Sequence, residues 1–330
     1  MKISFIGSGA WATALASTLA EKGFSPILYG LSKEEIDDIN INHRNSKYFP
    51  DIELNPSIKG TLDPQEAIVD ADVIVLAVPS KAVPSILGLF PENPAKPPLI
   101  INVIKGFDLD TGEGVTTKLT RLFASKARAI VSLLGPTFAY CVIHKDPTAC
   151  CAVSENIEAA REVQHLFSSS IFRVYVQRDL LGAEIGAGMK NAIAIASGIM
   201  SGLGYGDNAR AALLTRGLAE ITRYGIAKGA KAETFLGLTG IGDLTLTCSS
   251  PLSRNFSFGI EIGKANDAQT VILNSTKTVE GIRAAKSVHF DSARIGVETP
   301  IIDAVYRVLY ENKKPSDEVA NLMGRALKDE

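Results

Sequence analysis

Residues 2–12 read KISFIGSGAWA, and this stretch decides the fold. Its first part, KISFI, is short, mostly apolar and bounded by a glycine, which is typical of a buried strand. Gly7 and Gly9 then predict a turn, and the Ala-rich run WATALASTLAEKG that follows predicts a helix. A strand, a glycine turn and a helix in this order form the first step of an alternating β/α chain.

The glycine turn matches the G-x-G-x-x-G/A pattern of dinucleotide-binding folds. Gly7 permits the tight turn, and Gly9 lets the backbone approach a pyrophosphate. The N–H groups of Ala10, Trp11 and Ala12 would face that anion at the positive end of the helix dipole. Ala12 stands where the strict pattern has a third glycine, and Ala is an accepted alternative there. A plain glycine turn in a protein without a nucleotide is the competing interpretation, and the later strand-like runs disfavour it.

The rest of the chain extends this alternation and then changes character. Strand-like runs are residues 2–7, 25–30, 72–78, 98–104, 129–134 and 172–176. Several are apolar at nearly every position, so helices should cover both faces of a parallel sheet. After Arg178, Ala- and Gly-rich helical stretches dominate. We therefore predict an α/β fold with two domains: a doubly wound Rossmann-type parallel-sheet domain over 1–178 and a mostly α-helical substrate and catalytic domain over 179–330.

Composition narrows the classes of function. With 34 Lys and Arg against 36 Asp and Glu, the chain has no overall positive field for nucleic acid or an anionic membrane. The uncharged stretch 191–206 is too short to span a bilayer and predicts a buried core helix. The N-terminus lacks the features of a secretory signal, so we expect the mature protein to begin there.

Cysteines and histidines do not form a metal-binding pattern. Cys141, Cys150, Cys151 and Cys248 lack a CxxC spacing, and we expect reduced thiols in a cytoplasmic protein. The four histidines lack the i, i+4 spacing that places two ligands on one helix face. We predict no metal, and His144 is interpreted as a loop residue and not as a base.

The end of the second strand-like run bears on cofactor choice. Residues 29–33 (YGLSK) should face the adenosine ribose and contain no Asp or Glu to bind both ribose hydroxyls. Lys33 and Ser32 could tolerate a 2′-phosphate. Ser32 could equally be the N-cap of the next helix, with Glu35 completing a capping box. We predict that NADH and NADPH are both accepted.

Lys190 lies in the apolar sequence GAGMKNAIAIASG. Burial there would disfavour the ammonium and lower its pKa toward neutrality, as suits a group that moves the proton of a secondary alcohol. A snorkelling surface lysine is the alternative, but the neighbouring positions offer almost no polar face. Because an unpaired buried ammonium is costly, we expect Lys190→Met to keep or raise stability.

Further polar residues remain open on local grounds. Asp243, in TGIGDL, could orient Lys190 or form an ordinary Asx-turn. Arg254, between Ser253 and Asn255, offers a fork of donors suited to a phosphate, although SSPLSRN could also be a polar loop that leads into a helix.

Several segments match glycerol-3-phosphate dehydrogenases in order and spacing. They are 45–50 (NSKYFP), 102–106 (NVIKG), 135–139 (GPTFA), 188–191 (GMKN), 242–244 (GDL), 253–255 (SRN) and 279–281 (VEG). With the glycine turn they cover the chain from Gly7 to Gly281. The chain thus resembles the bacterial type of NAD(P)-dependent glycerol-3-phosphate dehydrogenase. It departs from that family at Ala12, at 31–32, where many members carry a basic pair for NADPH, and at Thr137, where Ser is usual.

This resemblance implies an oxidoreductase that interconverts sn-glycerol 3-phosphate and dihydroxyacetone phosphate with NAD or NADP and supplies phospholipid synthesis. It implies a homodimer. Lys190 would be the proton-transferring lysine and Asp243 its catalytic neighbour. Substrate contacts would be Lys105, Gly135, Thr137, Lys190, Asp243, Ser253, Arg254 and Asn255. Cofactor contacts would be Gly7, Gly9, Ala10, Trp11, Ser32, Tyr48, Lys105, Ala139, Arg254 and Glu280.

Two other functions stay open. A β-hydroxyacid dehydrogenase of the 6-phosphogluconate or hydroxyisobutyrate kind also pairs a nucleotide domain with a helical domain that carries a lysine. A non-catalytic dinucleotide sensor would bind the cofactor without turnover, and the buried lysine disfavours it.

Overall fold

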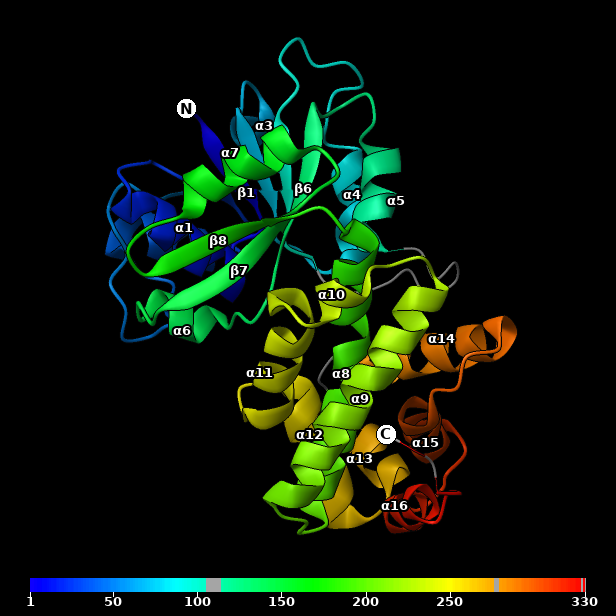
Figure 1. Ribbon diagram of the computed structural model, residues 1–330. Coiled ribbons are helices and arrows are strands. Elements are labelled where there is room, and N and C mark those ends of the chain that lie inside the picture. Colours follow the sequence, from blue (N-terminus) through cyan, green and yellow to red (C-terminus); the bar gives the residue numbers. More distant parts are fainter. Residues whose placement is uncertain (105–113, 276–278, 328, 330) are drawn as a thin grey trace. The chain divides into compact units, whose positions relative to one another are not determined.

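The computed structural model describes residues 1–104, 114–275, 279–327 and 329 (Figure 1). These residues form two compact units. The first contains residues 1–104 and 115–180, and the second contains residue 114 and the described residues after 180.

One eight-stranded sheet forms the centre of the first unit, with the order β3-β2-β1-β4-β5-β6-β7-β8. The first six positions follow the order 3-2-1-4-5-6 of doubly wound dinucleotide-binding folds, which reverses between β1 and β4. The predicted fold class is confirmed. The strands are β1 (Ile3–Ile6), β2 (Ile27–Tyr29), β3 (Lys59–Thr61), β4 (Val73–Leu76), β5 (Leu99–Asn102), β6 (Ala129–Leu134), β7 (Thr148–Val153) and β8 (Phe172–Gln177).

The expectation of a wholly parallel sheet is wrong at one junction. β7 runs antiparallel to β6, with Ser132 opposite Val153, while β8 is parallel to β7. The sequence TACCAV of β7 is made of small residues and gave no strand signal, so the reversal could not be anticipated. β3 was missed as well, because its three residues, KGT, contain no apolar run.

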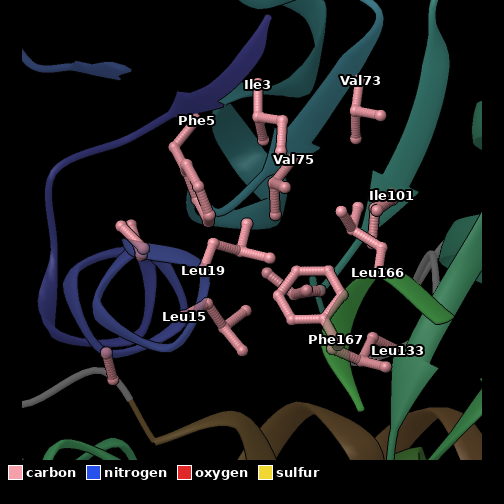
Figure 2. Close-up of a cluster of buried hydrophobic side chains, with 14 of the residues drawn as sticks. Ile3, Phe5, Leu15, Leu19, Val73, Val75, Ile101, Leu133, Leu166 and Phe167 are labelled. Carbon is pink, nitrogen blue, oxygen red and sulfur yellow. The ribbon is translucent and has the colours of Figure 1, made fainter. Parts of the chain in front are cut away.

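Helices cover both faces of the sheet, which explains the nearly continuous apolar strands. On one face, strand side chains pack against α1 (Ala10–Glu21) and α7 (Ile157–Phe167). Figure 2 shows this cluster, with Ile3, Phe5, Val73, Val75, Ile101 and Leu133 from the strands and Leu15, Leu19, Leu166 and Phe167 from the helices. On the other face, Ile74, Leu76 and Ile100 pack against Leu119 and Phe123. Burial of each such side chain contributes roughly 1.5–3 kcal/mol to the free energy of folding.

Shorter helices complete the first unit. They are α2 (Lys33–Asp37), η1 (Asp38–Asn42), α3 (Pro64–Ile68), η2 (Ser80–Ala82), α4 (Val83–Leu87), α5 (Val115–Leu122) and α6 (Ala139–Ile143).

The described part of the second unit is helical, and its central helix is α8 (Leu180–Gly202). Every residue of α8 from Gly182 to Ile199 is buried. The buried helix expected over 191–206 is therefore confirmed up to Ile199, whereas residues 200–206 are not buried and the helix ends at Gly202. Among the residues that the structure describes, no helix is long and apolar enough to cross a membrane. The other helices are α9 (Asp207–Ala227), α10 (Ala232–Phe235), η3 (Leu238–Gly242), α11 (Asp243–Ser249), α12 (Arg254–Ala265), α13 (Ala268–Asn274), α14 (Glu280–Ile295), α15 (Pro300–Tyr310) and α16 (Pro315–Met323).

Glycines let α8 and α12 touch. A Cβ at Gly198 would lie 2.1 Å from the Phe256 carbonyl oxygen, and a Cβ at Gly259 would lie 2.3 Å from the Ile195 carbonyl oxygen. Neither position tolerates a larger residue without moving a helix. This contact places the first two turns of α12 beside the C-terminal half of α8.

A buried carboxylate joins α9 to α15. Glu220 is 2% exposed, and its two carboxylate oxygens accept hydrogen bonds from the N–H groups of Ile301 (2.7 Å) and Ile302 (3.3 Å). The first turn of α15 thus gains an acceptor from another helix. Burial raises the pKa of Glu220 to about 7, against the lowering effect of the two backbone hydrogen bonds.

We expect Glu220 to make stability depend on pH. A carboxyl whose folded pKa is raised contributes stability that is fully present below its usual pKa of 4.5 and is lost as the pH rises through about 7. Relative to Glu220→Gln, which does not titrate, the wild-type chain should lose up to about 3 kcal/mol of unfolding free energy between these limits. Urea midpoints of both proteins at pH 4.5 and 7.5 measure this. Parallel pH profiles would contradict the role of Glu220.

Candidate active site

The glycine turn has the geometry of a pyrophosphate cradle. Gly7 has φ +121°, and a Cβ there would lie 2.5 Å from the carbonyl oxygen of Ala77, directly after β4. A Cβ at Gly9 would meet nothing within 4 Å, so the space above this residue is open. No side chain caps the N-terminus of α1, and its first turn holds no acidic residue. These features leave N–H groups and a positive helix end at the switch point, where a dinucleotide fits.

A buried amide fixes the glycine turn from a distant loop. Asn45 is 1% exposed, and its Nδ2 donates hydrogen bonds to the Ser8 carbonyl oxygen (2.8 Å) and to Thr13 Oγ1 (2.9 Å). In the sequence, Asn45 stands out only as part of the segment 45–50 that resembles the family. Its role as a clamp was missed because no local pattern links residues 37 positions apart.

The region after β2 contains the Glu35 carboxylate, for which the local sequence predicts only a role in a capping box. Ser32 is the N-cap of α2, one of the two roles left open by the sequence, and its Oγ accepts a hydrogen bond from the Glu35 N–H (3.3 Å). The Glu35 side chain does not complete the expected capping box. Its carboxylate instead accepts a hydrogen bond from Ser8 Oγ (2.9 Å) and pairs with Lys47. Lys47 Nζ also lies 5.2 Å from the centre of the Tyr48 ring.

The loop after β6 is the third part of the first unit with predicted site residues. Gly135 has φ +146°, and a Cβ there would lie 3.0 Å from Cys150 Cα on β7. Thr137 Oγ1 donates a hydrogen bond of 3.4 Å to the Gly135 carbonyl oxygen. Ala139 begins α6, which packs against α1, the helix of the glycine turn. Lys105 lies outside the described residues.

In the second unit, Lys190 and Asp243 form a buried ion pair. Lys190 is 4% exposed and Asp243 is 1% exposed. Lys190 Nζ also donates a hydrogen bond of 3.0 Å to Thr247 Oγ1, and this hydroxyl donates to the Asp243 carbonyl oxygen (2.6 Å). Thr247 was missed, although its i+4 spacing from Asp243 places both on one face of α11.

This pair corrects our expectation that the Lys190 ammonium is unpaired. Apart from Asn191, the nearest residues on α8 are apolar, but Asp243 reaches Lys190 from another helix, as the family resemblance implied. A close approach permits this, since a Cβ at Gly186 would lie 2.4 Å from the Thr239 carbonyl oxygen just before Asp243.

Amide groups connect the neighbouring site residues. Asn255 Nδ2 donates to Asn191 Oδ1 (3.0 Å), and Asn255 Oδ1 accepts a hydrogen bond from the Gly281 N–H (2.9 Å). Asn191 Nδ2 donates a longer hydrogen bond of 3.4 Å to Glu280 Oε2. The network ties α8, α12 and the start of α14 together. Asn191, directly after Lys190, was not predicted as a site residue.

The start of α12 presents a free cation beside this network. Ser253 is its N-cap, and its Oγ accepts a hydrogen bond from the Phe256 N–H (3.3 Å). Arg254 follows at the first helical position and is exposed. No ion pair or hydrogen bond engages its guanidinium within the described part of the chain. A cation at a helix N-terminus suits an anionic ligand.

Among the described residues, no group of three His, Cys, Asp or Glu side chains could hold a metal ion, and all four cysteines are free. A doubly wound sheet with an open glycine turn, together with a helical unit that buries a Lys–Asp pair, defines a dinucleotide-dependent oxidoreductase.

Comparison with known proteins identifies the family. Residues 2–160 match the model of the N-terminus of NAD-dependent glycerol-3-phosphate dehydrogenase, and residues 179–320 match the model of its C-terminus. The chain belongs to this family.

Full-length relatives agree with this assignment. The chain is 41% identical over 330 residues to a glycerol-3-phosphate dehydrogenase (NAD(P)+) of Listeria monocytogenes serotype 4b, covering 100% of this chain and 98% of the relative. It is 44% identical over 329 residues to the corresponding protein of Clostridium botulinum (strain Alaska E43 / Type E3), covering 100% and 99%. The crystal structure of glycerol-3-phosphate dehydrogenase from Coxiella burnetii is similar, with a TM-score of 0.87, 30% identity and coverage of 98% and 99%.

The ion pair leads to a prediction about stability. Lys190→Met removes the cation that faces the buried Asp243 carboxylate, so we expect the unfolding free energy to fall by about 3–5 kcal/mol. The sequence alone predicts unchanged or higher stability. Thermal denaturation of the purified variant measures it. The double variant Lys190→Met/Asp243→Asn, which removes both charges, should recover most of the loss. A single variant as stable as wild type would show that the pair does not form.

Proposed function

We propose that this chain transfers a hydride between sn-glycerol 3-phosphate and NAD(P), giving dihydroxyacetone phosphate and NAD(P)H, and that the reaction runs in both directions. The observation that carries the proposal is the buried Lys190–Asp243 pair in a chain of this family. When bound, NAD(P) accepts the hydride from the secondary alcohol carbon. The protein must then supply a group that takes the hydroxyl proton.

Lys190 is the proton-transferring residue of this proposal. Its amine takes the hydroxyl proton during oxidation, and its ammonium returns a proton to the forming alkoxide during reduction. Asp243 and Thr247 hold Nζ in position from α11, because one pairs with it and the other accepts its hydrogen bond. Since all three side chains are buried or nearly so, solvent competes little with the substrate for that proton.

Charged and polar groups at the start of α12 bind the phosphate. Arg254 supplies an exposed guanidinium, and the Asn255 amide lies in the network that includes Asn191. Ser253, Gly135, Thr137 and Lys105 complete the substrate contacts by family resemblance, and Asp243 and Lys190 line the reacting centre. The glycine turn, with Gly7, Gly9, Ala10 and Trp11, binds the pyrophosphate. Ser32, Tyr48, Lys105, Ala139, Arg254 and Glu280 are the further cofactor contacts.

Membership of the family argues against the alternative function of a β-hydroxyacid dehydrogenase. The buried Lys190–Asp243 pair argues against a non-catalytic dinucleotide sensor. We place the enzyme in the cytoplasm, where its four thiols would stay reduced, as a supplier of glycerol 3-phosphate for phospholipid synthesis. We also propose a homodimer, a state that mass measurement in solution decides.

Loss of NAD(P)H absorbance with dihydroxyacetone phosphate tests the activity. The wild-type protein should oxidise NAD(P)H in the presence of dihydroxyacetone phosphate. Lys190→Met should lower kcat by about 10²- to 10⁴-fold, because general acid–base catalysis acts in the transition state, and should leave NADH affinity unchanged. Asp243→Asn keeps Lys190 but removes the carboxylate that orients it, so the kcat of this variant is compared with that of Lys190→Met. A folded Lys190→Met protein with turnover within a few-fold of wild type would require another acid.

Arg254 provides a separate test of the phosphate site. Arg254→Ala should raise KM for dihydroxyacetone phosphate strongly, since truncating one side of a desolvated charge pair costs on the order of 2–5 kcal/mol. Arg210→Ala, on the exposed ion pair with Asp207, is the control and should leave KM unchanged. Steady-state kinetics measure both. An unchanged KM for substrate and cofactor in Arg254→Ala would exclude the assignment.

A further inference from the structure

The Glu35 carboxylate lies at the point where the glycine turn meets the end of β2. Ser8, between the two glycines, donates its hydroxyl hydrogen bond to Glu35 Oε2 at 2.9 Å. A Cβ at Gly30, directly after β2, would lie 2.5 Å from the same hydroxyl oxygen. The Ser8 hydroxyl therefore touches both the end of β2 and Glu35.

In doubly wound folds, this corner receives the adenosine ribose. An Asp or Glu there hydrogen-bonds the ribose 2′-hydroxyl of NAD, while a nearby basic residue accommodates the 2′-phosphate of NADP. Residues 29–33 supply no such carboxylate. The structure brings one from the first turn of α2 instead, since Glu35 is held against the turn by Ser8.

The positive charges near this corner are not equivalent. Lys33, which the sequence offered as a partner for a 2′-phosphate, pairs with Asp37. Lys47 pairs with Glu35, and its side chain is 60% exposed while that of Glu35 is 11% exposed. Lys47 can therefore exchange its partner for an incoming anion, whereas the Glu35 carboxylate stays fixed by Ser8.

We propose that Glu35 and Lys47 together determine the choice between NAD and NADP, an inference that rests on the proposed function. Glu35 accepts a hydrogen bond from the ribose 2′-hydroxyl and repels a 2′-phosphate. Lys47 offsets that repulsion by turning from Glu35 to the phosphate. The pair thus lets one site take both cofactors although positions 31 and 32 are Leu and Ser.

Binding of the adenosine half of each cofactor tests this without turnover. Isothermal titration of the full chain with ADP and with 2′,5′-ADP gives a ratio of Kd values. Glu35→Gln should shift that ratio at least about tenfold toward 2′,5′-ADP, because a like charge is removed next to the phosphate. Lys47→Met should shift it by about as much in the opposite direction. Lys33→Met, the matched control with its own carboxylate partner, should change it less than about twofold.

The two variants decide the proposal separately from the activity. An unchanged ratio in folded Glu35→Gln and Lys47→Met, with normal reduction of dihydroxyacetone phosphate by NADH, would overturn the role of the pair and leave the proposed function standing. Shifted ratios in a protein without that turnover would support the pair and contradict the proposed function. Should Glu35→Gln melt well below wild type, the ratio in Lys47→Met alone decides.

Discussion

A buried ion pair organises the helical unit. Lys190 and Asp243 are both almost inaccessible, and moving two such charges from water costs several kcal/mol per ion before their attraction offsets it. Well-packed apolar side chains would stabilise a helix interior at least as well. The pair is therefore weak as a device for stability, which supports the proposal that it serves proton transfer by a lysine amine held away from solvent.

Close helix contacts keep this pair in register. Glycines on α8 and α12 meet at distances that exclude any larger side chain, and Gly186 lets η3 approach α8 just before Asp243. The Asn255 side chain donates a hydrogen bond to Asn191 and accepts one from the Gly281 N–H, so it connects α8, α12 and α14. Rigid backbone contacts and directional amide bonds together limit where the amine can move, as the proposed acid–base role would require.

The elements that could be predicted from the sequence are those whose pattern lies in neighbouring residues. Continuous apolar runs predicted strands of a sheet that is covered on both faces. Gly7 and Gly9 predicted the turn, because turn preferences depend on the residues at the turn itself. The antiparallel strand β7 was not predicted, because its small residues show no alternation of apolar and polar side chains. Two contacts between distant segments were missed, Asn45 on the glycine turn and Glu35 against Ser8, because they depend on packing that no local pattern encodes. The approach of Asp243 to Lys190 was implied by the family resemblance and not by the local sequence.

Chemical rescue tests the central claim most directly. Lys190→Ala leaves space for a small primary amine where the lysine side chain stood. If Lys190 moves the substrate proton, this variant should reduce dihydroxyacetone phosphate very slowly, and added methylamine or ethylamine should restore turnover in proportion to its concentration while NADH affinity stays constant. Turnover by folded Lys190→Ala close to wild type without any added amine would contradict the account.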